Sequence, residues 1–107
     1  MALPKRDTEW LREWREIVLR NAGHRCERCK HPASQAHHVI SRRIHSLRYD
    51  PRNGCALCLP CHMRVHDMTP RKFMEWFELT RLNDHGYLQR MKRAIKTQKP
   101  VDTDSAW

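Results

Sequence analysis

The N-terminal part of the chain carries apolar residues at helical spacing, separated by charged residues. These apolar positions are Trp10, Leu11, Trp14, Ile17 and Val18. Because such spacing gives a helix one apolar face, it predicts a helix over residues 8–22, with Thr8 or Asp7 as its N-cap and Gly23 as its stop. Both tryptophans are expected in the core rather than on a surface that stacks nucleic-acid bases.

Two short apolar runs in the middle of the chain predict strands over residues 34–40 and 55–57. The segment between them, 41–53, is polar and basic and is predicted to be a loop, and Gly54 after it permits a tight turn. Residues 60–67 are predicted to form a short helix that begins at the proline of this segment, because proline suits the first turn of a helix.

Two further helices are predicted in the C-terminal part. The first covers residues 70–82 and begins with Thr69 as its cap, and the second covers residues 87–97. Their apolar faces are Phe73, Met74, Trp76 and Phe77 in the first helix and Leu88, Met91 and Ile95 in the second. The tail over 99–107 is expected to be disordered, since termini that do not pack usually are.

A chain of 107 residues fits one domain, here expected over residues 1–98 around a core at 24–67. A domain this small buries a modest core, so a metal ion that crosslinks it would help it fold. No apolar run is long enough to span a membrane, and the N-terminus shows no secretion signal. We therefore expect no membrane association and a reducing, cytoplasmic location.

Basic residues outnumber acidic ones, with 21 Lys and Arg against 12 Asp and Glu and a formal net charge of +9. Such an excess favours a polyanionic partner, and nucleic acid is the usual one. Arginines gather in the predicted loop between the strands, at positions Arg42, Arg43, Arg48 and Arg52. They are candidate phosphate contacts, although an ordinary solvated basic loop accounts for them equally well. Lysines and arginines near the C-terminus are expected to add nonspecific affinity.

Four of the five cysteines form two Cys-x-x-Cys pairs, Cys26/Cys29 and Cys58/Cys61. An odd number without a secretion signal favours metal binding over a disulfide framework. Four thiolates close a tetrahedral, structural Zn²⁺ site. Cys55 is an alternative ligand, because it too is followed by a cysteine at Cys-x-x-Cys spacing. We prefer the two later cysteines, since Cys55 stands where a strand would bury a small apolar side chain.

Seven of the eight histidines fall between His24 and His66. His62 and His66 are four residues apart in a predicted helix, so both face the same side. His37 can supply a third ligand from the preceding strand, which gives the open three-ligand site typical of catalytic metals. Because neighbouring side chains of a strand point in opposite directions, His38 then stays free of the metal and is suited to accept a proton from water.

These residues resemble the HNH endonuclease family, in the four-cysteine form common in phage and prophage genes. The resemblance covers about residues 26–66. It rests on the histidine doublet in 36–40, the Asn-Gly in 50–54 and the Cys-His-x-x-x-His in 57–66, which stand in the family's order. It implies a small α+β fold, namely a ββα-metal core of treble-clef type that is stapled by a four-cysteine zinc site and flanked by helices.

The resemblance also implies a role for each site residue. His38 matches the general base, and His37, His62 and His66 match the ligands of one catalytic divalent metal. Asn53 matches the asparagine that braces the loop carrying the base, although in some relatives that asparagine is a metal ligand. Where other relatives have an aspartate this chain has His37, and the nitrogen-rich site favours Zn²⁺, Ni²⁺ or Mn²⁺ over Mg²⁺.

The activity implied is hydrolysis of DNA phosphodiester bonds, on double-stranded DNA, by nicking or double-strand cleavage. A water activated by His38 would attack phosphorus, while the metal stabilises the phosphate and the departing 3′ oxygen. The resemblance places the protein in a bacterial or phage-infected cell and suggests phage packaging proteins as partners. Whether the enzyme acts as a monomer or a homodimer stays open.

Other functions compete with this interpretation. A non-catalytic zinc-stapled DNA-binding module would need the cysteines but neither the histidine doublet nor the two helical histidines. A zinc-dependent nucleobase deaminase uses His-x-Glu followed by Pro-Cys-x-x-Cys, and the chain contains no His-x-Glu. Cleavage of RNA is compatible with the same residues.

Overall fold

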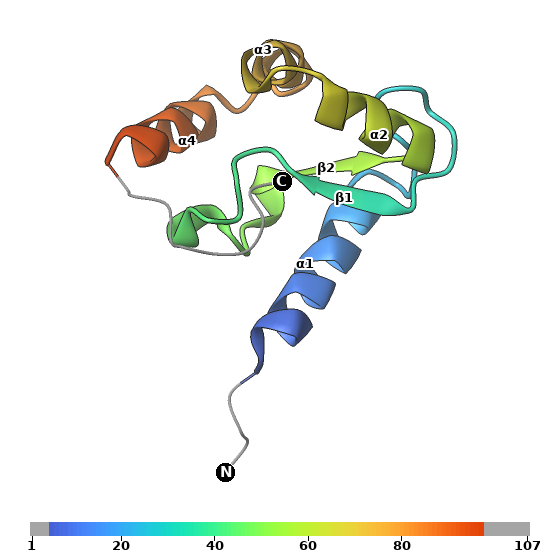
Figure 1. Ribbon diagram of the computed structural model, residues 1–107, viewed down its shortest axis with the longest axis horizontal. Helices are drawn as coiled ribbons and strands as arrows, with labels where there is room; N and C mark the ends of the chain where they lie inside the picture. The colour runs from blue at the N-terminus through green and yellow to red at the C-terminus, as the bar shows by residue number, and fades with distance from the viewer. Residues whose placement is uncertain (1–4, 98–107) are drawn as a thin grey trace.

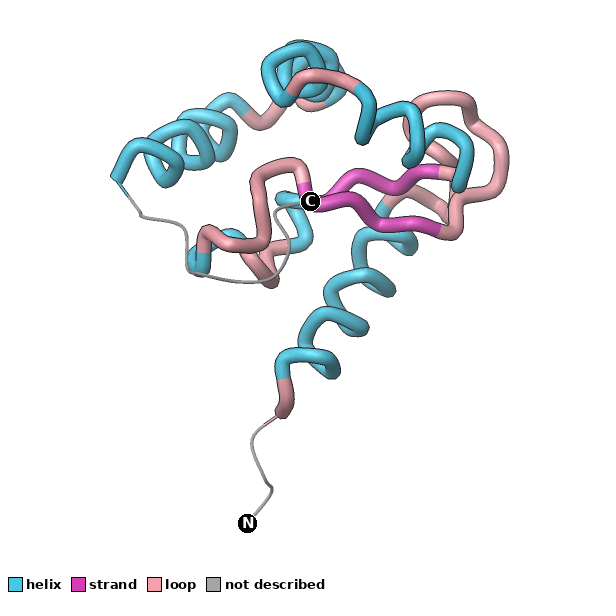
Figure 2. Tube along the Cα trace, viewed as in Figure 1, coloured by secondary structure: helices cyan, strands magenta, loops and turns pink. Residues whose placement is uncertain are grey.

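The computed structural model describes residues 5–97, and the tail predicted to be disordered, 99–107, lies outside them. The elements in chain order are α1 (Asp7–Asn21), β1 (Gln35–His38), β2 (Gly54–Leu57), α2 (Leu59–Asp67), α3 (Pro70–Thr80) and α4 (His85–Thr97). Across the described residues the fold is therefore small and α+β, with one two-stranded antiparallel sheet and four helices, as predicted (Figures 1 and 2). No helix in this part of the chain combines the length and apolarity needed to span a membrane.

Helices cover both faces of the sheet. The strands pair antiparallel, with His37 opposite Cys55 and His38 opposite Gly54, and successive side chains point to opposite faces. On one face α1 lies against the strand pair (Figure 1), and its buried residues pack against Ala56 of β2. On the other face Leu57 joins a larger core with α2, α3 and α4. The sheet therefore separates the side chains of the histidine doublet.

The close approach of α1 requires a glycine at the start of β2. A side chain on Gly54 would collide with Val18 of α1, and its Cβ would also lie 3.1 Å from Trp14 Cζ2. Trp14 itself is buried, and its indole Nε1 donates to the Asp50 carbonyl at 2.8 Å. These contacts fix α1 against the strand pair and bring the Trp14 ring close to the candidate active site.

Two predictions about α1 are wrong. Trp10 is 43% exposed and contacts the Tyr49 ring at 5.8 Å instead of joining the core. Neither predicted cap forms, because the helix starts at Arg6 as N-cap without a side-chain hydrogen bond. Asp7 is used elsewhere, since its carboxylate accepts hydrogen bonds from Arg48 and Tyr49.

The two C-terminal helices form as predicted, but α4 buries a partly different set of side chains from the set that was expected. Thr69 caps α3 by accepting a hydrogen bond from the Lys72 amide at 3.2 Å. The α4 helix begins two residues before the predicted start, at His85, and buries Tyr87 where Ile95 was expected. Ile95 is 48% exposed, so the prediction that it joins the core is wrong.

The 41–53 loop is more ordered than its polar sequence suggests. It contains two short 3₁₀ turns, His45–Leu47 and Pro51–Asn53. Ile44 and Leu47 from this loop are buried in the larger core. The loop is thereby held against the rest of the domain, which matters because it contacts His38.

Candidate metal centres and active site

Four cysteines converge at one end of the domain. The Sγ atoms of Cys26, Cys29, Cys58 and Cys61 all lie within 4.8 Å of one another. The Cys29 and Cys58 sulfurs are 3.5 Å apart, close to the edge of about 3.8 Å expected for a tetrahedron with Zn–S bonds of about 2.3 Å. Four thiolates at this spacing suit Zn²⁺, so the donor set fits a closed structural zinc site.

Local structure explains why the sulfurs meet. Cys29 donates its amide to the Cys26 sulfur at 3.5 Å in the first turn, and Cys58 is the N-cap of α2 in the second. Burial raises the pKa of the Cys26 thiol, but backbone N–H groups of both turns outweigh burial and lower the pKa to about 6. Thiolate formation, which zinc binding requires, is therefore favoured at Cys26.

Cys55 stands apart from this cluster. It is fully buried in β2, opposite His37, and burial strongly raises the pKa of its thiol. The cluster of described residues includes Cys58 and Cys61 instead. The choice that the sequence left open therefore falls on the two later cysteines, and Cys55 acts as a small apolar core residue.

Glu27, between the first two cysteines, ties the zinc-site turn to the sheet. Its amide donates to the Ala56 carbonyl at 2.9 Å, and its carboxylate accepts from the Ala56 amide at 2.8 Å. Arg81, just after α3, pairs with the same carboxylate at 2.6 Å. This brace joins the cysteine turn, β2 and α3, and nothing in the sequence pattern indicated it.

Three histidines form a second cluster. The ring nitrogens of His37, His62 and His66 lie within 4.8 Å of one another. The Nε2 atoms of His62 and His66 are 3.1 Å apart, near the edge of about 3.3 Å for a tetrahedron with metal–nitrogen bonds of about 2.0–2.1 Å. With three histidine ligands, and no further histidine, cysteine or carboxylate of the described residues in the cluster, the geometry fits an open divalent-metal site of the kind predicted.

The environment of His37 and His62 favours the neutral imidazole, which is the form that binds metals. Burial lowers the pKa of His37 to about 3, and burial also lowers the pKa of His62. The Phe73 ring packs edge-on against the His37 ring, with centroids 5.0 Å apart. A cavity of about 180 Å³ lies beside the cluster, lined by His37, Val65, His66, Met68, Pro70 and Phe73. The cluster is therefore open to a small ligand.

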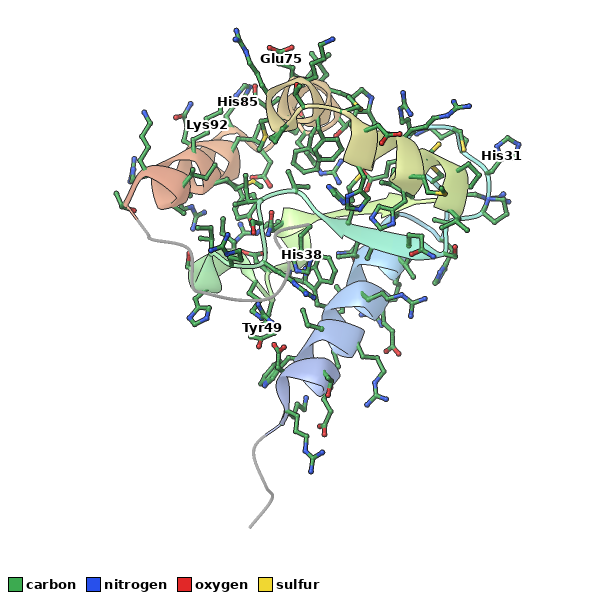
Figure 3. All side chains as sticks on the ribbon, viewed as in Figure 1. His31, His38, Tyr49, Glu75, His85 and Lys92 are labelled. Atoms are coloured by element: carbon green, nitrogen blue, oxygen red, sulfur yellow. The ribbon has the colours of Figure 1, made fainter. Side chains whose placement is uncertain are left out.

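His38 lies on the side of the sheet that faces α1 (Figure 3). Its ring stacks on the Trp14 ring, with centroids 3.8 Å apart and planes 7° from parallel. Its Nε2 lies 2.9 Å from the Arg48 carbonyl oxygen. A carbonyl oxygen only accepts hydrogen bonds, so Nε2 carries the hydrogen and Nδ1 keeps the free lone pair. Nδ1 is therefore the ring nitrogen whose lone pair could accept a proton.

Burial lowers the pKa of His38 to about 4, although the Arg48 carbonyl opposes this shift. The imidazole is thus neutral at pH 7 and able to accept a proton. A network of charges holds the carbonyl in place: Arg48 pairs with Asp7 at 2.7 Å and donates to the Arg42 carbonyl at 2.9 Å. Arg48 also holds the pKa of the Asp7 carboxyl down at about 2. Neither the Trp14 stack nor this ion pair was predicted from the sequence.

Asn53 is the last residue of the 41–53 loop and is fully buried. Its side chain bonds to Ile40, just before the loop begins, and to Leu47 in the middle of the loop. Its side-chain oxygen accepts from the Ile40 amide at 2.7 Å, and its side-chain nitrogen donates to the Ile40 and Leu47 carbonyls, both at 3.0 Å. These bonds use both N–H donors of the amide and one acceptor position of its oxygen. The geometry is that of a brace for the loop that contacts His38.

Replacing Asn53 with alanine is expected to lower the free energy of unfolding by about 2–5 kcal/mol, because buried backbone groups of Ile40 and Leu47 lose their partners. Chemical denaturation measures this change. The matched control is Asn83→Ala at an exposed position, where we expect little effect. A wild-type unfolding midpoint for Asn53→Ala would show that the three bonds do not hold the loop.

The four predicted phosphate-contact arginines differ in their surroundings. Arg48 pairs with Asp7, and Arg52 pairs with Asp50 at 3.2 Å while lying over the Tyr87 ring. Arg42 and Arg43 lie earlier in the loop and are half-buried. The charges of the two later arginines are therefore offset by carboxylates of the same domain. Contact of any of the four arginines with DNA stays a prediction.

Together, the two antiparallel strands, the helix after them, the histidine cluster and the cysteine cluster define a zinc-stapled ββα-metal core. The family model for HNH endonuclease matches residues 26–68, which span this core, and the predicted resemblance is thereby confirmed. The match supports a nuclease-type function. Searches of curated proteins and of solved structures found no match to this chain.

Proposed function

We propose that this protein is a metal-dependent endonuclease that hydrolyses DNA phosphodiester bonds, with His38 as its general base. The observation that carries the proposal is the histidine doublet. His37 turns to the two histidines of α2, while His38 turns to the other face and is fixed as a neutral imidazole with a free Nδ1. A metal-ligand cluster and a base on consecutive residues supply two groups that phosphodiester hydrolysis needs.

In this mechanism His38 Nδ1 takes a proton from the attacking water, and the Arg48 carbonyl stabilises the imidazolium that forms by accepting from Nε2. The Trp14 ring holds the imidazole plane during this transfer. Asn53 positions the loop and touches no reacting atom. When bound by His37, His62 and His66, a divalent ion supplies Lewis-acid stabilisation of the charge on the phosphate and the 3′ oxygen.

The donor set and the charge of the chain narrow the cofactor and the substrate. Three imidazoles favour Mn²⁺, Ni²⁺ or Zn²⁺ over Mg²⁺, because nitrogen ligands suit transition metals. A net charge of +9 suits the DNA backbone, and its phosphates would meet Arg42 and Arg43 beside the active site. Double-stranded DNA is the proposed substrate. Action in the cytoplasm agrees with five cysteines that form no disulfide.

The proposal is tested by incubating supercoiled plasmid with protein that keeps its structural zinc but has been stripped of the catalytic metal. Mg²⁺, Mn²⁺, Ni²⁺ and Zn²⁺ are then added singly. We expect nicked or linear plasmid with wild type and loss of cleavage with His62→Ala, because that variant loses a metal ligand. His85→Ala, at an exposed histidine, is the matched control. Plasmid that is bound but intact under every metal would instead identify a zinc-stapled DNA-binding module.

A further inference from the structure

A second cavity, away from the histidine cluster, lies between α4 and the 41–53 loop. Its volume is about 290 Å³. Its lining combines the polar or charged side chains of Ser46, Asp50, Arg52, Arg90, Arg93 and Thr97 with Leu47, Tyr87 and Ala94. In Figure 1 α4 and this loop both lie on the side of the molecule opposite α2. Nothing in the proposed cleavage mechanism uses these residues.

Positive charge in this cavity is only partly compensated. The Asp50 carboxylate accepts from the Arg52 amide at 2.9 Å and pairs with the Arg52 guanidinium at 3.2 Å, so those two charges offset each other. Arg90 and Arg93 are exposed on successive positions of one α4 face, and no carboxylate of the described residues lies within 4.0 Å of either guanidinium. The cavity therefore presents two uncompensated cations.

An unsatisfied buried group points to a ligand. Tyr87 is 4% exposed, and within the described part of the chain its hydroxyl makes no hydrogen bond of 3.5 Å or less, although the Asp50 carboxylate of the same cavity is close enough to add to the rise in the Tyr87 pKa that burial causes. Buried hydroxyls almost always have a hydrogen-bond partner. The Arg52 guanidinium lies over the Tyr87 ring, 4.0 Å from its centroid, which fixes the ring. Because a neutral tyrosine hydroxyl donates readily, an acceptor oxygen in the cavity would complete the site.

We propose that this cavity binds a phosphate of the nucleic-acid backbone, next to the phosphate that is cleaved. Arg90 and Arg93 would supply the charge, and the Tyr87 hydroxyl would donate to a phosphate oxygen. The inference rests on the proposed function, because the same loop serves both sites. Leu47 and Asp50 line the cavity, and Arg48 between them holds His38 through its carbonyl. The cavity and the contact to His38 are thus built from neighbouring residues of one loop.

Tyr87→Phe gives the sharpest test, because it moves two measurements in opposite directions. Removing an unsatisfied buried hydroxyl is expected to raise the Tm of the free protein. Losing a hydrogen bond to a charged oxygen is expected to weaken duplex DNA binding about tenfold. Fluorescence anisotropy with a labelled duplex, without added divalent metal, measures binding separately from cleavage. Unchanged DNA affinity together with a raised Tm would mean that the hydroxyl is merely unsatisfied, and the inference would be overturned.

The double variant Arg90→Gln/Arg93→Gln separates this site from general charge attraction. Its matched control is Arg12→Gln/Arg20→Gln, which removes the same charge from exposed positions of α1. If one phosphate is held in the cavity, the cavity pair should lower the salt dependence of log K by about 1 and weaken binding several-fold more than the control pair. Equal losses in both pairs would overturn the inference.

The same variants distinguish a nucleic-acid phosphate from a free anion. Inorganic phosphate, titrated against the side-chain NMR signals of Arg90 and Arg93, is the second probe. The proposal is supported if duplex DNA shifts these signals and the shifts are smaller in Tyr87→Phe. It is overturned if the signals shift with inorganic phosphate but not with duplex DNA. If wild type cleaves plasmid but the cavity variants behave like the control pair, only this inference fails. If wild type binds no duplex, the nuclease proposal fails with it.

Discussion

His38→Ala is expected to lower the rate of plasmid cleavage by about 10²–10⁴-fold, the usual contribution of a general base. The loss follows from the position of the imidazole, whose Nε2 is committed to the Arg48 carbonyl and whose Nδ1 is the remaining acceptor. The proposed metal ligands, His37 and the two histidines of α2, lie on the other side of the sheet and stay unchanged. The rate is measured at saturating metal and DNA, so that the result reports the chemical step.

Two comparisons decide whether this loss is chemical. Circular dichroism and Tm of His38→Ala should stay close to wild type, since only the ring stack on Trp14 and one hydrogen bond are removed. The metal content at the histidine cluster should also be retained, unlike in His62→Ala. A His38→Ala protein that cleaves at the wild-type rate would show that another group, or solvent, takes the proton.

Cys58→Ser is expected to abolish the folded state. Structural zinc contributes roughly 10–16 kcal/mol in small zinc domains, and a domain is stabilised by only about 5–15 kcal/mol in total. Loss of one of the four thiolates, and with it the zinc, therefore costs more free energy than the whole free energy of unfolding of the domain. Far-UV circular dichroism, thermal unfolding and bound zinc per chain measure the outcome.

Cys55→Ala is the matched control, because Cys55 is three residues away and fully buried but outside the sulfur cluster. It should keep its zinc and unfold cooperatively, with a modest loss of stability from the missing sulfur. The opposite pattern, with zinc kept by Cys58→Ser and lost by Cys55→Ala, would assign the ligand to Cys55 instead.

Short-range sequence patterns predicted most of the fold and both clusters. Helices with one apolar face, a threonine cap before a proline and Cys-x-x-Cys turns each depend on residues a few positions apart. The spacing of His62 and His66 likewise fixes their common side on α2. Strand alternation predicted that His37 and His38 diverge, and the pairing of β1 with β2 confirms it.

What escaped prediction depends on contacts between distant segments. Trp14 belonged to the predicted core, but its stacking on His38 follows from how α1 crosses the sheet. The pairing of Asp7 with Arg48 joins residues 41 positions apart, and it removed the expected cap of α1. Ile95 was assigned to the buried face of α4, whose true orientation is set by packing against the 41–53 loop. Periodicity cannot report the rotation of a helix about its axis.

Consecutive residues of α2 belong to different candidate metal centres, since Cys61 contributes a sulfur to the cysteine cluster and His62 a nitrogen to the histidine cluster. An ion that fixes the position of Cys61 would therefore also fix the position of the next residue of the helix, His62. We therefore expect that an ion in the cysteine site would raise the affinity of the histidine site for its ion, and by thermodynamic linkage the reverse would hold by the same factor. On this expectation the helix would couple the binding of the two ions, and protein without its structural zinc would lose affinity for the catalytic metal as well as stability.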